Sequence, residues 1–191
     1  MGQFFYVSDY HFFHELSLRR SRPEFSSVKE MNEEIVRRHN SKVSEHDHIY
    51  ILGDVVVCEE EQLEYCLSQT VDKLKGHLHL IIGNHDLKYR ENPVFTSRFD
   101  TVDDALWIKD SQKSVQLFHY PILMWHRKGK GAYHIYGHLH NERKGESIEW
   151  LAHQDRALNA CVEINHYEPC QIEELILNNE RFRQSIFEAT K

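Results

Sequence analysis

Near the middle of the chain the sequence reads Leu80-Ile81-Ile82-Gly83-Asn84-His85-Asp86. A short apolar run bounded by a glycine is typical of a buried β-strand. The three residues after the glycine supply an amide oxygen, an imidazole and a carboxylate, which are groups that bind cations or transfer protons. At this point a predicted strand therefore ends in side chains suited to chemistry.

Four further apolar runs end in the same way. They lie at residues 4–7, 48–52, 115–118 and 133–136, and they lead into Asp9 and His11, Asp54, His119, and His138 and His140. In extended backbone, residues two apart point to the same side, so a pair such as Asp9 and His11 can reach one cation. Asp54 follows a glycine that permits a sharp turn, and its two oxygens can bridge two cations. Because ligand sites in α/β sheets gather at the carboxyl ends of strands, the five strand ends are expected to converge.

Three helical patterns accompany these strands. They open at Ser27, run from about 60 to 74, and cover 172–177 after a strand-like segment at 157–164. The first has Glu30 in capping-box register with Ser27 and carries its apolar residues on one face. Alternation of strand and helix at the start implies parallel pairing, whereas the closely spaced strands after Lys113 imply tighter turns.

Length and composition favour a single domain over residues 1–191. The chain is 40% hydrophobic and has no linker or repeat, so one core is expected. No apolar run is long enough for a signal peptide or a membrane span, which predicts a cytoplasmic protein without a membrane partner. The four cysteines form no CxxC pair and are interpreted as reduced packing residues.

Charge and histidine content narrow the function. A net charge of −7 argues against a stable nucleic-acid partner, because such binding is driven by Lys and Arg at phosphates. A bound dication can reverse the sign of the local field, so a small anionic substrate remains compatible with an acidic protein. The 15 histidines exceed what a core or a surface requires and favour metal binding.

The order of these motifs resembles that of the calcineurin-like metallophosphoesterase superfamily. The motifs are Asp9-x-His11, Gly53-Asp54, Gly83-Asn84-His85-Asp86, a lone His119 and Gly137-His138-x-His140. The small size of the chain, its Asp9-Tyr10-His11-Phe12-Phe13-His14 opening and the segment Phe118-His119-Tyr120-Pro121 are similar to a compact bacterial group of predicted phosphoesterases. This resemblance implies an α/β fold of four layers, an αββα sandwich of two packed mixed β-sheets flanked by helices.

The same resemblance implies a dinuclear centre with two divalent transition-metal ions, chosen from Mn, Fe, Zn and Ni, with Mn favoured. It would place Asp9, His11 and His140 on one ion, Asn84, His119 and His138 on the other, and Asp54 between them. His85 would protonate the leaving oxygen or stabilise charge in the transition state, and Asp86 would orient His85. The implied reaction is hydrolysis of a phosphate ester by a metal-bridging hydroxide, with phosphodiesters or nucleotides favoured as substrates.

Several residues near the motifs have two interpretations. His14 either contacts the substrate phosphate or packs beneath its loop. Arg127, in the Gly- and Lys-rich loop 126–131, either meets an anionic substrate or belongs to an ordinary solvated loop. The arginines at 19, 20 and 22 either hold phosphate or keep a connection soluble. Tyr120 and Trp125 either stack on a nucleobase or pack internally.

Three alternative functions stay open at the level of sequence. A phosphomonoesterase of the same fold would use the same centre with a different rim. A non-catalytic metal-binding scaffold would keep the fold and lose ligands, which the full ligand set disfavours. A mononuclear iron oxygenase with two histidines and one carboxylate would need fewer ligands than the chain offers. The sequence leaves the oligomeric state open.

Overall fold

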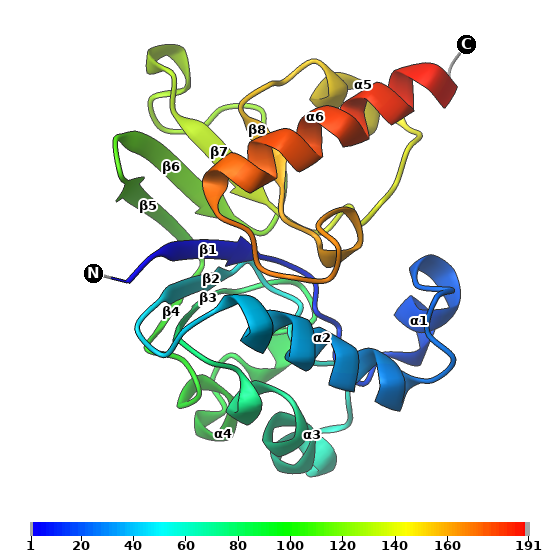
Figure 1. Cartoon of the computed structure of the whole chain (residues 1–191). Helices are drawn as coiled ribbons and strands as arrows, with labels where there is room; N and C mark the ends of the chain where they lie inside the picture. Colours follow the sequence, from blue (N-terminus) through cyan, green and yellow to red (C-terminus); the bar gives the residue numbers. More distant parts are fainter. Residues whose placement is uncertain (1, 190–191) are drawn as a thin grey trace.

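Two four-stranded sheets form the centre of the computed structural model, which describes residues 2–189 (Figure 1). The first sheet contains, in spatial order, β1 (Phe4–Val7), β2 (His48–Ile51), β3 (His77–Ile81) and β4 (Thr101–Asp103). The second contains β5 (Ala105–Asp110), β6 (Lys113–Phe118), β7 (Tyr133–Tyr136) and β8 (Ala157–Asn159). The β5–β6 pair is antiparallel and every other pair is parallel.

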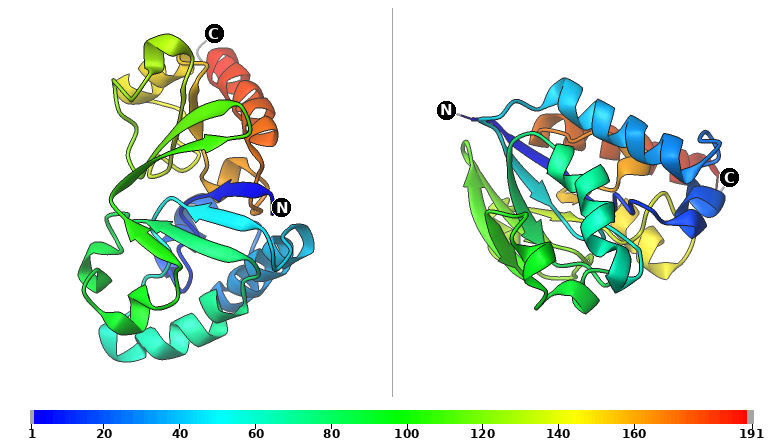
Figure 2. Two further views of the ribbon diagram at one scale, coloured as in Figure 1. Left: turned by 90° about the vertical axis from the view of Figure 1, so that its left-hand side faces the viewer. Right: turned by 90° about the horizontal axis from the view of Figure 1, so that it is seen from below.

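Helices cover the outer faces of both sheets, so the molecule has four layers (Figure 2). They are α1 (Glu15–Ser21), α2 (Val28–Lys42), α3 (Leu63–Gln69), α4 (Pro93–Thr96), α5 (Glu146–Ala152) and α6 (Ile172–Ala189). The ribbon views place α2, α3 and α4 below the first sheet and α5 and α6 above the second (Figures 1 and 2). The predicted fold of two sheets flanked by helices is confirmed, although mixed pairing holds only for the second sheet.

The alternation of side chains along β1 divides the core into two parts. Val7 points to the helical layer and packs in one cluster with Met31 and Ile35 of α2. Tyr6 points the other way and packs with Leu117 and Ile135 of the second sheet. Because β1 has apolar residues on both faces, its sheet is an inner layer of the sandwich, as expected for parallel strands.

Three predicted elements differ in the structure, and the first of them is the helix predicted at 172–177, which continues to Ala189 as α6. The segment 157–164 was predicted as one strand, but β8 ends at Asn159 and a 3-10 turn covers Val162–Ile164. The predicted helix at 60–74 is a shorter α3 flanked by 3-10 turns. No helix within residues 2–189 is long and apolar enough to cross a membrane.

Candidate metal centre

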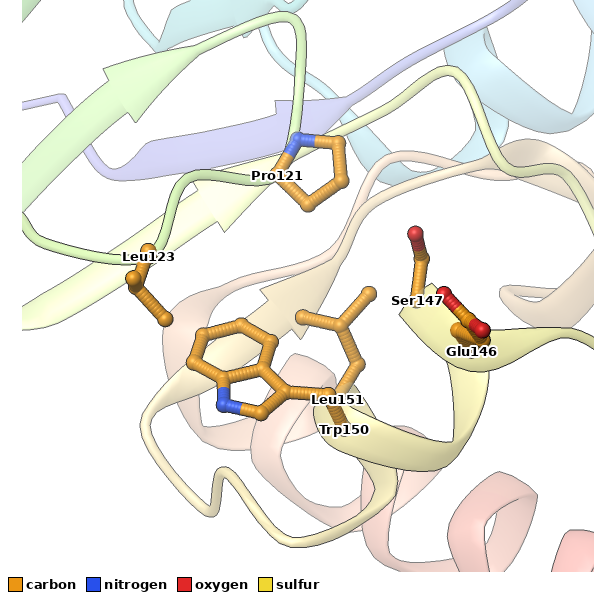
Figure 3. Close-up of a pocket in the computed structure, with 6 residues that line it drawn as sticks. All are labelled: Pro121, Leu123, Glu146, Ser147, Trp150 and Leu151. Carbon is orange, nitrogen blue, oxygen red and sulfur yellow. The ribbon is translucent and has the colours of Figure 1, made fainter.

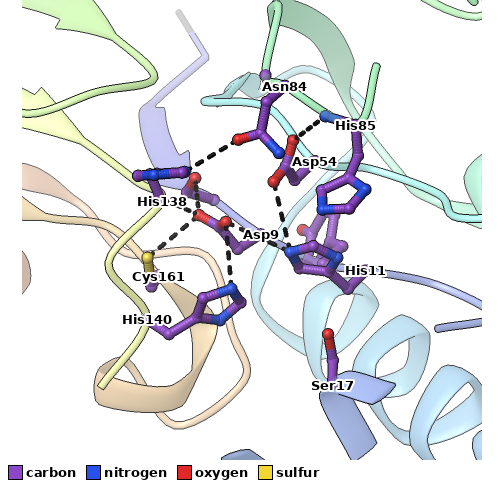
Figure 4. Close-up of polar contacts among 12 residues, drawn as sticks. Asp9, His11, Ser17, Asp54, Asn84, His85, His138, His140 and Cys161 are labelled. Atoms are coloured by element: carbon purple, nitrogen blue, oxygen red, sulfur yellow. Dashed lines mark hydrogen bonds and ion pairs between the residues drawn. The ribbon is translucent and has the colours of Figure 1, made fainter. Parts of the chain in front are cut away.

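The five polar strand ends meet at one edge of the two sheets (Figure 4). Three clusters of side chains there have ligand atoms close enough to hold a metal ion: Asp9 with His11 and His140, Asp54 with His119 and His138, and His11 with Asp54 and His85. The first sheet supplies the loops after β1, β2 and β3, and the second supplies those after β6 and β7. Side chains more than a hundred positions apart therefore converge, as the sequence predicted.

The backbone at these strand ends is unusual. Five of the predicted ligands have positive φ angles: Asp9 (58°), His11 (48°), Asp54 (55°), His138 (71°) and His140 (47°). Non-glycine residues rarely adopt this left-handed conformation, and it concentrates at functional sites because it costs conformational energy. The concentration of strained residues marks the same edge of the molecule as the convergence of ligands.

Two glycines let the loops approach one another closely. A Cβ atom at Gly137 would collide with the side chains of Ser8 and Asp9, and one at Gly83 would collide with Asp54. The glycines that precede His138 and Asn84 in the sequence motifs therefore have a steric role.

We call Asp9, His11 and His140 the first half-site. Oδ2 of Asp9 accepts hydrogen bonds from the backbone N of His138 (2.9 Å), from Sγ of Cys161 (3.1 Å) and from Oγ of Ser8. Its Oδ1 lies 3.5 Å from Nε2 of His11 and 3.7 Å from Nε2 of His140. Within residues 2–189, this Oδ1 and Nε2 of His11 are buried without a hydrogen-bond partner. Because buried polar atoms are rarely left unpaired, a cation between them fits the site.

Asp54 lies between the two halves of the centre. Its Oδ1 accepts a hydrogen bond from the backbone N of His85 (2.8 Å). Its Oδ2 lies 3.5 Å from Nε2 of His11 and 3.7 Å from Nε2 of His119. One carboxylate oxygen thus faces a histidine from each of two candidate clusters.

We call Asn84, His119 and His138 the second half-site. Oδ1 of Asn84 lies 3.0 Å from Nε2 of His119 and 2.9 Å from Nδ1 of His138. Nδ1 of His119 lies 2.6 Å from the carbonyl oxygen of Leu52, to which it can donate. That hydrogen bond would place the proton of His119 on Nδ1 and leave the Nε2 lone pair toward Asp54 and Asn84.

Burial sets the ionisation of the site. Burial, followed by the charge of Asp9, raises the pKa of Asp54 from 3.8 to about 7. Burial opposes ionisation of Asp9 as well, but contact with His11 and the nearby imidazoles holds its pKa below the ordinary value. Burial lowers the pKa of His11 to about 4, so this imidazole is neutral and able to bind a cation at neutral pH.

The carboxylate of Asp86 bonds to backbone groups, and its charge also acts on His85. Its carboxylate is fully buried and accepts hydrogen bonds from the backbone N of Asp54 (2.8 Å), Gly83 (2.9 Å) and Val55 (3.0 Å). These bonds join the loops after β2 and β3, so Asp86 organises backbone here, and its predicted effect on the orientation of His85 stays a prediction. The ring of His85 lies 5.0 Å from that of His11, at the rim of the first half-site.

Arg127 lies before β7, at the opposite end of that strand from the candidate ligands. Its carbonyl accepts a hydrogen bond from Ala132, the residue directly before β7, whereas the candidate ligand His138 follows the other end of β7. The yellow-green connection before β7 accordingly lies away from the ends of β1 and β7 in Figure 1. Trp125 is buried and donates to the carbonyl of Ala132, which supports the packing interpretation. Tyr120 does lie at the centre, with its ring 4.7 Å from that of His138.

Two buried residues behind the first half-site were not predicted to support it. Glu163 lies 2.8 Å from Nδ1 of His140, and Arg22 forms an ion pair with Glu163. Burial disfavours the charge of Glu163, but Arg22 and His140 outweigh it and lower the pKa of Glu163. No sequence motif includes Glu163, and for Arg22 the sequence indicates only phosphate binding or solubility.

A cavity of about 270 Å³ adjoins the first half-site. Its lining includes His11, His14, His85 and His140 and, from α1, Ser17 and Arg20. His14 contacts both the first half-site and α1. Its Nδ1 lies 3.0 Å from Nδ1 of His11 and 2.7 Å from Oγ of Ser17. A separate cavity of about 310 Å³ between Pro121 and Trp150 has no candidate ligand in its lining (Figure 3).

Comparisons with known proteins identify relatives along most of the chain. No protein-family model matches the sequence. An uncharacterized protein of Methanocaldococcus jannaschii is 24% identical over 176 residues, covering 92% of this chain and 90% of that protein. The crystal structure of a protein of unknown function from Aquifex aeolicus has a TM-score of 0.67 and 26% identity, covering 88% of this chain and 95% of that one. A predicted phosphoesterase from Streptococcus pneumoniae, at 17% identity, a TM-score of 0.34 and coverage of 72% and 62%, is too dissimilar to bear on fold or function.

Proposed function

We propose that this protein is a metal-dependent phosphoesterase that binds two divalent cations. The observation that carries the proposal is the position of Asp54 Oδ2, which faces His11 of the first half-site at 3.5 Å and His119 of the second at 3.7 Å. Two cations that share one carboxylate suit in-line displacement at phosphorus, because they can clamp the attacking and the leaving oxygen together. The mixed oxygen and imidazole ligands fit Mn, Fe, Zn or Ni, and we favour Mn.

The bound cations would supply positive charge at the phosphate and lower the pKa of an attacking water. The protein's own contribution is geometric. Hydrogen bonds to Oδ2 of Asp9 and to Oδ1 of Asp54 turn the other oxygen of each carboxylate toward the histidines. The half-buried His85 lies on the cavity wall, where its ring could donate a proton to the leaving oxygen. His14 lines the same cavity and could contact the substrate phosphate.

The substrate is proposed to be a small phosphate ester whose organic group enters the 270 Å³ cavity. Among such esters we favour phosphodiesters or nucleotides over monoesters. A phosphomonoesterase would use the same residues, so the two activities are separated by assay.

The test combines metal analysis with two model substrates. Purified protein loaded with Mn²⁺ is expected to bind about two ions per chain and to hydrolyse bis-(4-nitrophenyl) phosphate faster than 4-nitrophenyl phosphate. Asp54→Asn replaces one oxygen of the shared carboxylate with an amide nitrogen and removes its charge, and His85→Ala removes the proposed acid. Each variant should therefore reduce turnover by about 10²–10⁴-fold.

Asp155→Asn and His46→Ala are matched controls, because both residues are exposed and neither belongs to a candidate cluster. Both should retain wild-type turnover. A wild-type protein that binds no transition metal would exclude the proposed function, and full activity of His85→Ala would exclude its role as proton donor.

A further inference from the structure

A buried ion pair lies directly behind the first half-site. Arg22 Nη2 and Glu163 Oε1 are 3.0 Å apart, and their side chains are 0% and 1% exposed. The pair joins two distant parts of the chain, since Arg22 follows α1 and Glu163 lies in the turn after β8. Burying two charges is costly, and such pairs are often no more stabilising than apolar residues of the same size. Stability alone is therefore a weak reason for this pair.

Arg22 fixes the backbone that carries Asp9 and His11. Its Nη2 donates to the carbonyl of Asp9 (2.6 Å) and its Nη1 donates to the carbonyl of Tyr10 (2.7 Å). Asp9 and His11 both have positive φ, a conformation that the surrounding structure must hold in place. Arg22 thus restrains the strained turn from behind while its Nε donates to Glu163 (3.0 Å).

Glu163 fixes the third member of the half-site. Its Oε1 lies 2.8 Å from Nδ1 of His140. Because a carboxylate only accepts, this hydrogen bond keeps the proton of His140 on Nδ1 and leaves the Nε2 lone pair toward Oδ1 of Asp9, 3.7 Å away. A carboxylate behind a histidine ligand orients the ring and raises its basicity.

The two half-sites differ in this respect. Nδ1 of His119, in the second half-site, faces the neutral carbonyl oxygen of Leu52 and not a carboxylate. Glu163 contacts His140, Arg22 and Ser21, and none of these belongs to the second half-site. A change at Glu163 should therefore act on one half of the centre.

We propose that Glu163, backed by Arg22, is a positioning residue that sets the cation affinity of the first half-site. This inference rests on the proposed function, because it assumes that the centre binds cations. The inference concerns only the cation affinity of one half-site. It assigns a supporting role to Glu163, a residue that belongs to none of the sequence motifs.

The experiment is a calorimetric titration of the chelator-treated full chain with Mn²⁺. Wild type is expected to bind two equivalents. In Glu163→Gln one equivalent should bind as in wild type, while the other weakens by about 10–100-fold, the usual effect of losing such a partner. The magnetic coupling between two neighbouring Mn²⁺ ions, seen by electron paramagnetic resonance, should disappear at concentrations that fill only the stronger site.

Two further variants separate positioning from general damage. Glu163→Gln leaves the buried Arg22 without a counter-charge and could prevent folding. In that case the double variant Arg22→Gln/Glu163→Gln, which removes both charges, takes its place in the titration. Glu168→Gln is the matched control, because Glu168 lies in the same segment but pairs with Lys42. It should bind both equivalents normally.

Unchanged affinity for both equivalents in a folded Glu163 variant would overturn the inference. Equal weakening of both equivalents would also overturn it, because it would indicate a general loss of structure. If wild type binds no Mn²⁺, the proposed function itself fails, and the two failures are thereby distinguished.

Discussion

At the scale of single residues, the two oxygens of each buried carboxylate, Asp9 and Asp54, face different groups. Asp9 and Asp54 each turn one oxygen to hydrogen-bond donors and the other to imidazole nitrogens. Without a cation, two such groups do not ionise equally, and Asp54 retains its proton to about pH 7. A proton and a cation then compete for the same oxygen.

Competition from the Asp54 proton should therefore make the affinity for Mn²⁺ rise by up to about tenfold per pH unit between pH 5 and 7, and the affinity should then level off. His11 adds nothing to this dependence, because burial lowers its pKa to about 4. Calorimetry in two buffers of different ionisation enthalpy should detect nearly one proton released from Asp54 at pH 6 and almost none at pH 8.5. Equal affinities at pH 5.5 and 8 would contradict the assignment.

The stability of the metal-free protein should depend on pH with the opposite sign. The pKa of Asp54 is about 7 in the fold, against 3.8 ordinarily, so the folded state binds this proton more tightly than the unfolded chain does. The contribution of Asp54 to the free energy of unfolding is thus greatest below about pH 4 and declines as the pH rises to 7.

At the scale of elements, the centre depends on sharp exits from short strands. β7 ends at Tyr136, and Gly137 then passes so close to Ser8 and Asp9 that no side chain fits. Gly137→Ala should push the β7 exit away from Asp9, reducing stability by about 1–3 kcal/mol and weakening Mn²⁺ binding at both half-sites. Thermal denaturation and metal titration would measure the two effects.

Gly129→Ala is the matched control for Gly137→Ala, because a Cβ atom at Gly129 meets nothing within 4 Å. It should leave metal binding unchanged. If Gly137→Ala bound Mn²⁺ like wild type, the close approach of β7 to β1 would not be a requirement of the centre.

The elements also show what sequence could and could not predict. β1 and β7 were predicted with their observed bounds, because each is a short apolar run followed by polar residues. β5 was missed because it alternates between exposed and half-buried residues and lacks a continuous apolar run. α1 was missed because its sequence, rich in Ser and Arg, has no apolar stripe.

The same contrast holds for the candidate site. Its predicted ligands follow strands in the sequence, so pattern and topology together place them at one edge. Glu163 and Arg22 support those ligands through contacts that no local pattern encodes, since they lie 141 positions apart. The backbone partners of Asp86 could not be predicted for a related reason, because they are not its neighbours in the sequence.

At the scale of the whole molecule, the centre joins the two sheets. The first sheet supplies Asp9, His11, Asp54 and Asn84, and the second supplies His119, His138 and His140. Cations bound to both sets would link the sheets at this edge, whereas the hydrophobic cluster between them holds the sandwich elsewhere. The metal-free protein should therefore stay folded but be less stable.

Saturation with Mn²⁺ should consequently raise the melting temperature. One site filled at 100 times its Kd adds about 2.7 kcal/mol, which corresponds to roughly 5–10 °C for a domain of this size. Differential scanning calorimetry with Mn²⁺ and with a chelator would measure the shift. Asp54→Asn should lose most of the increment because it removes the shared ligand, and Asp155→Asn should retain it. An increment of wild-type size in Asp54→Asn would mean that the cations which stabilise the protein bind elsewhere.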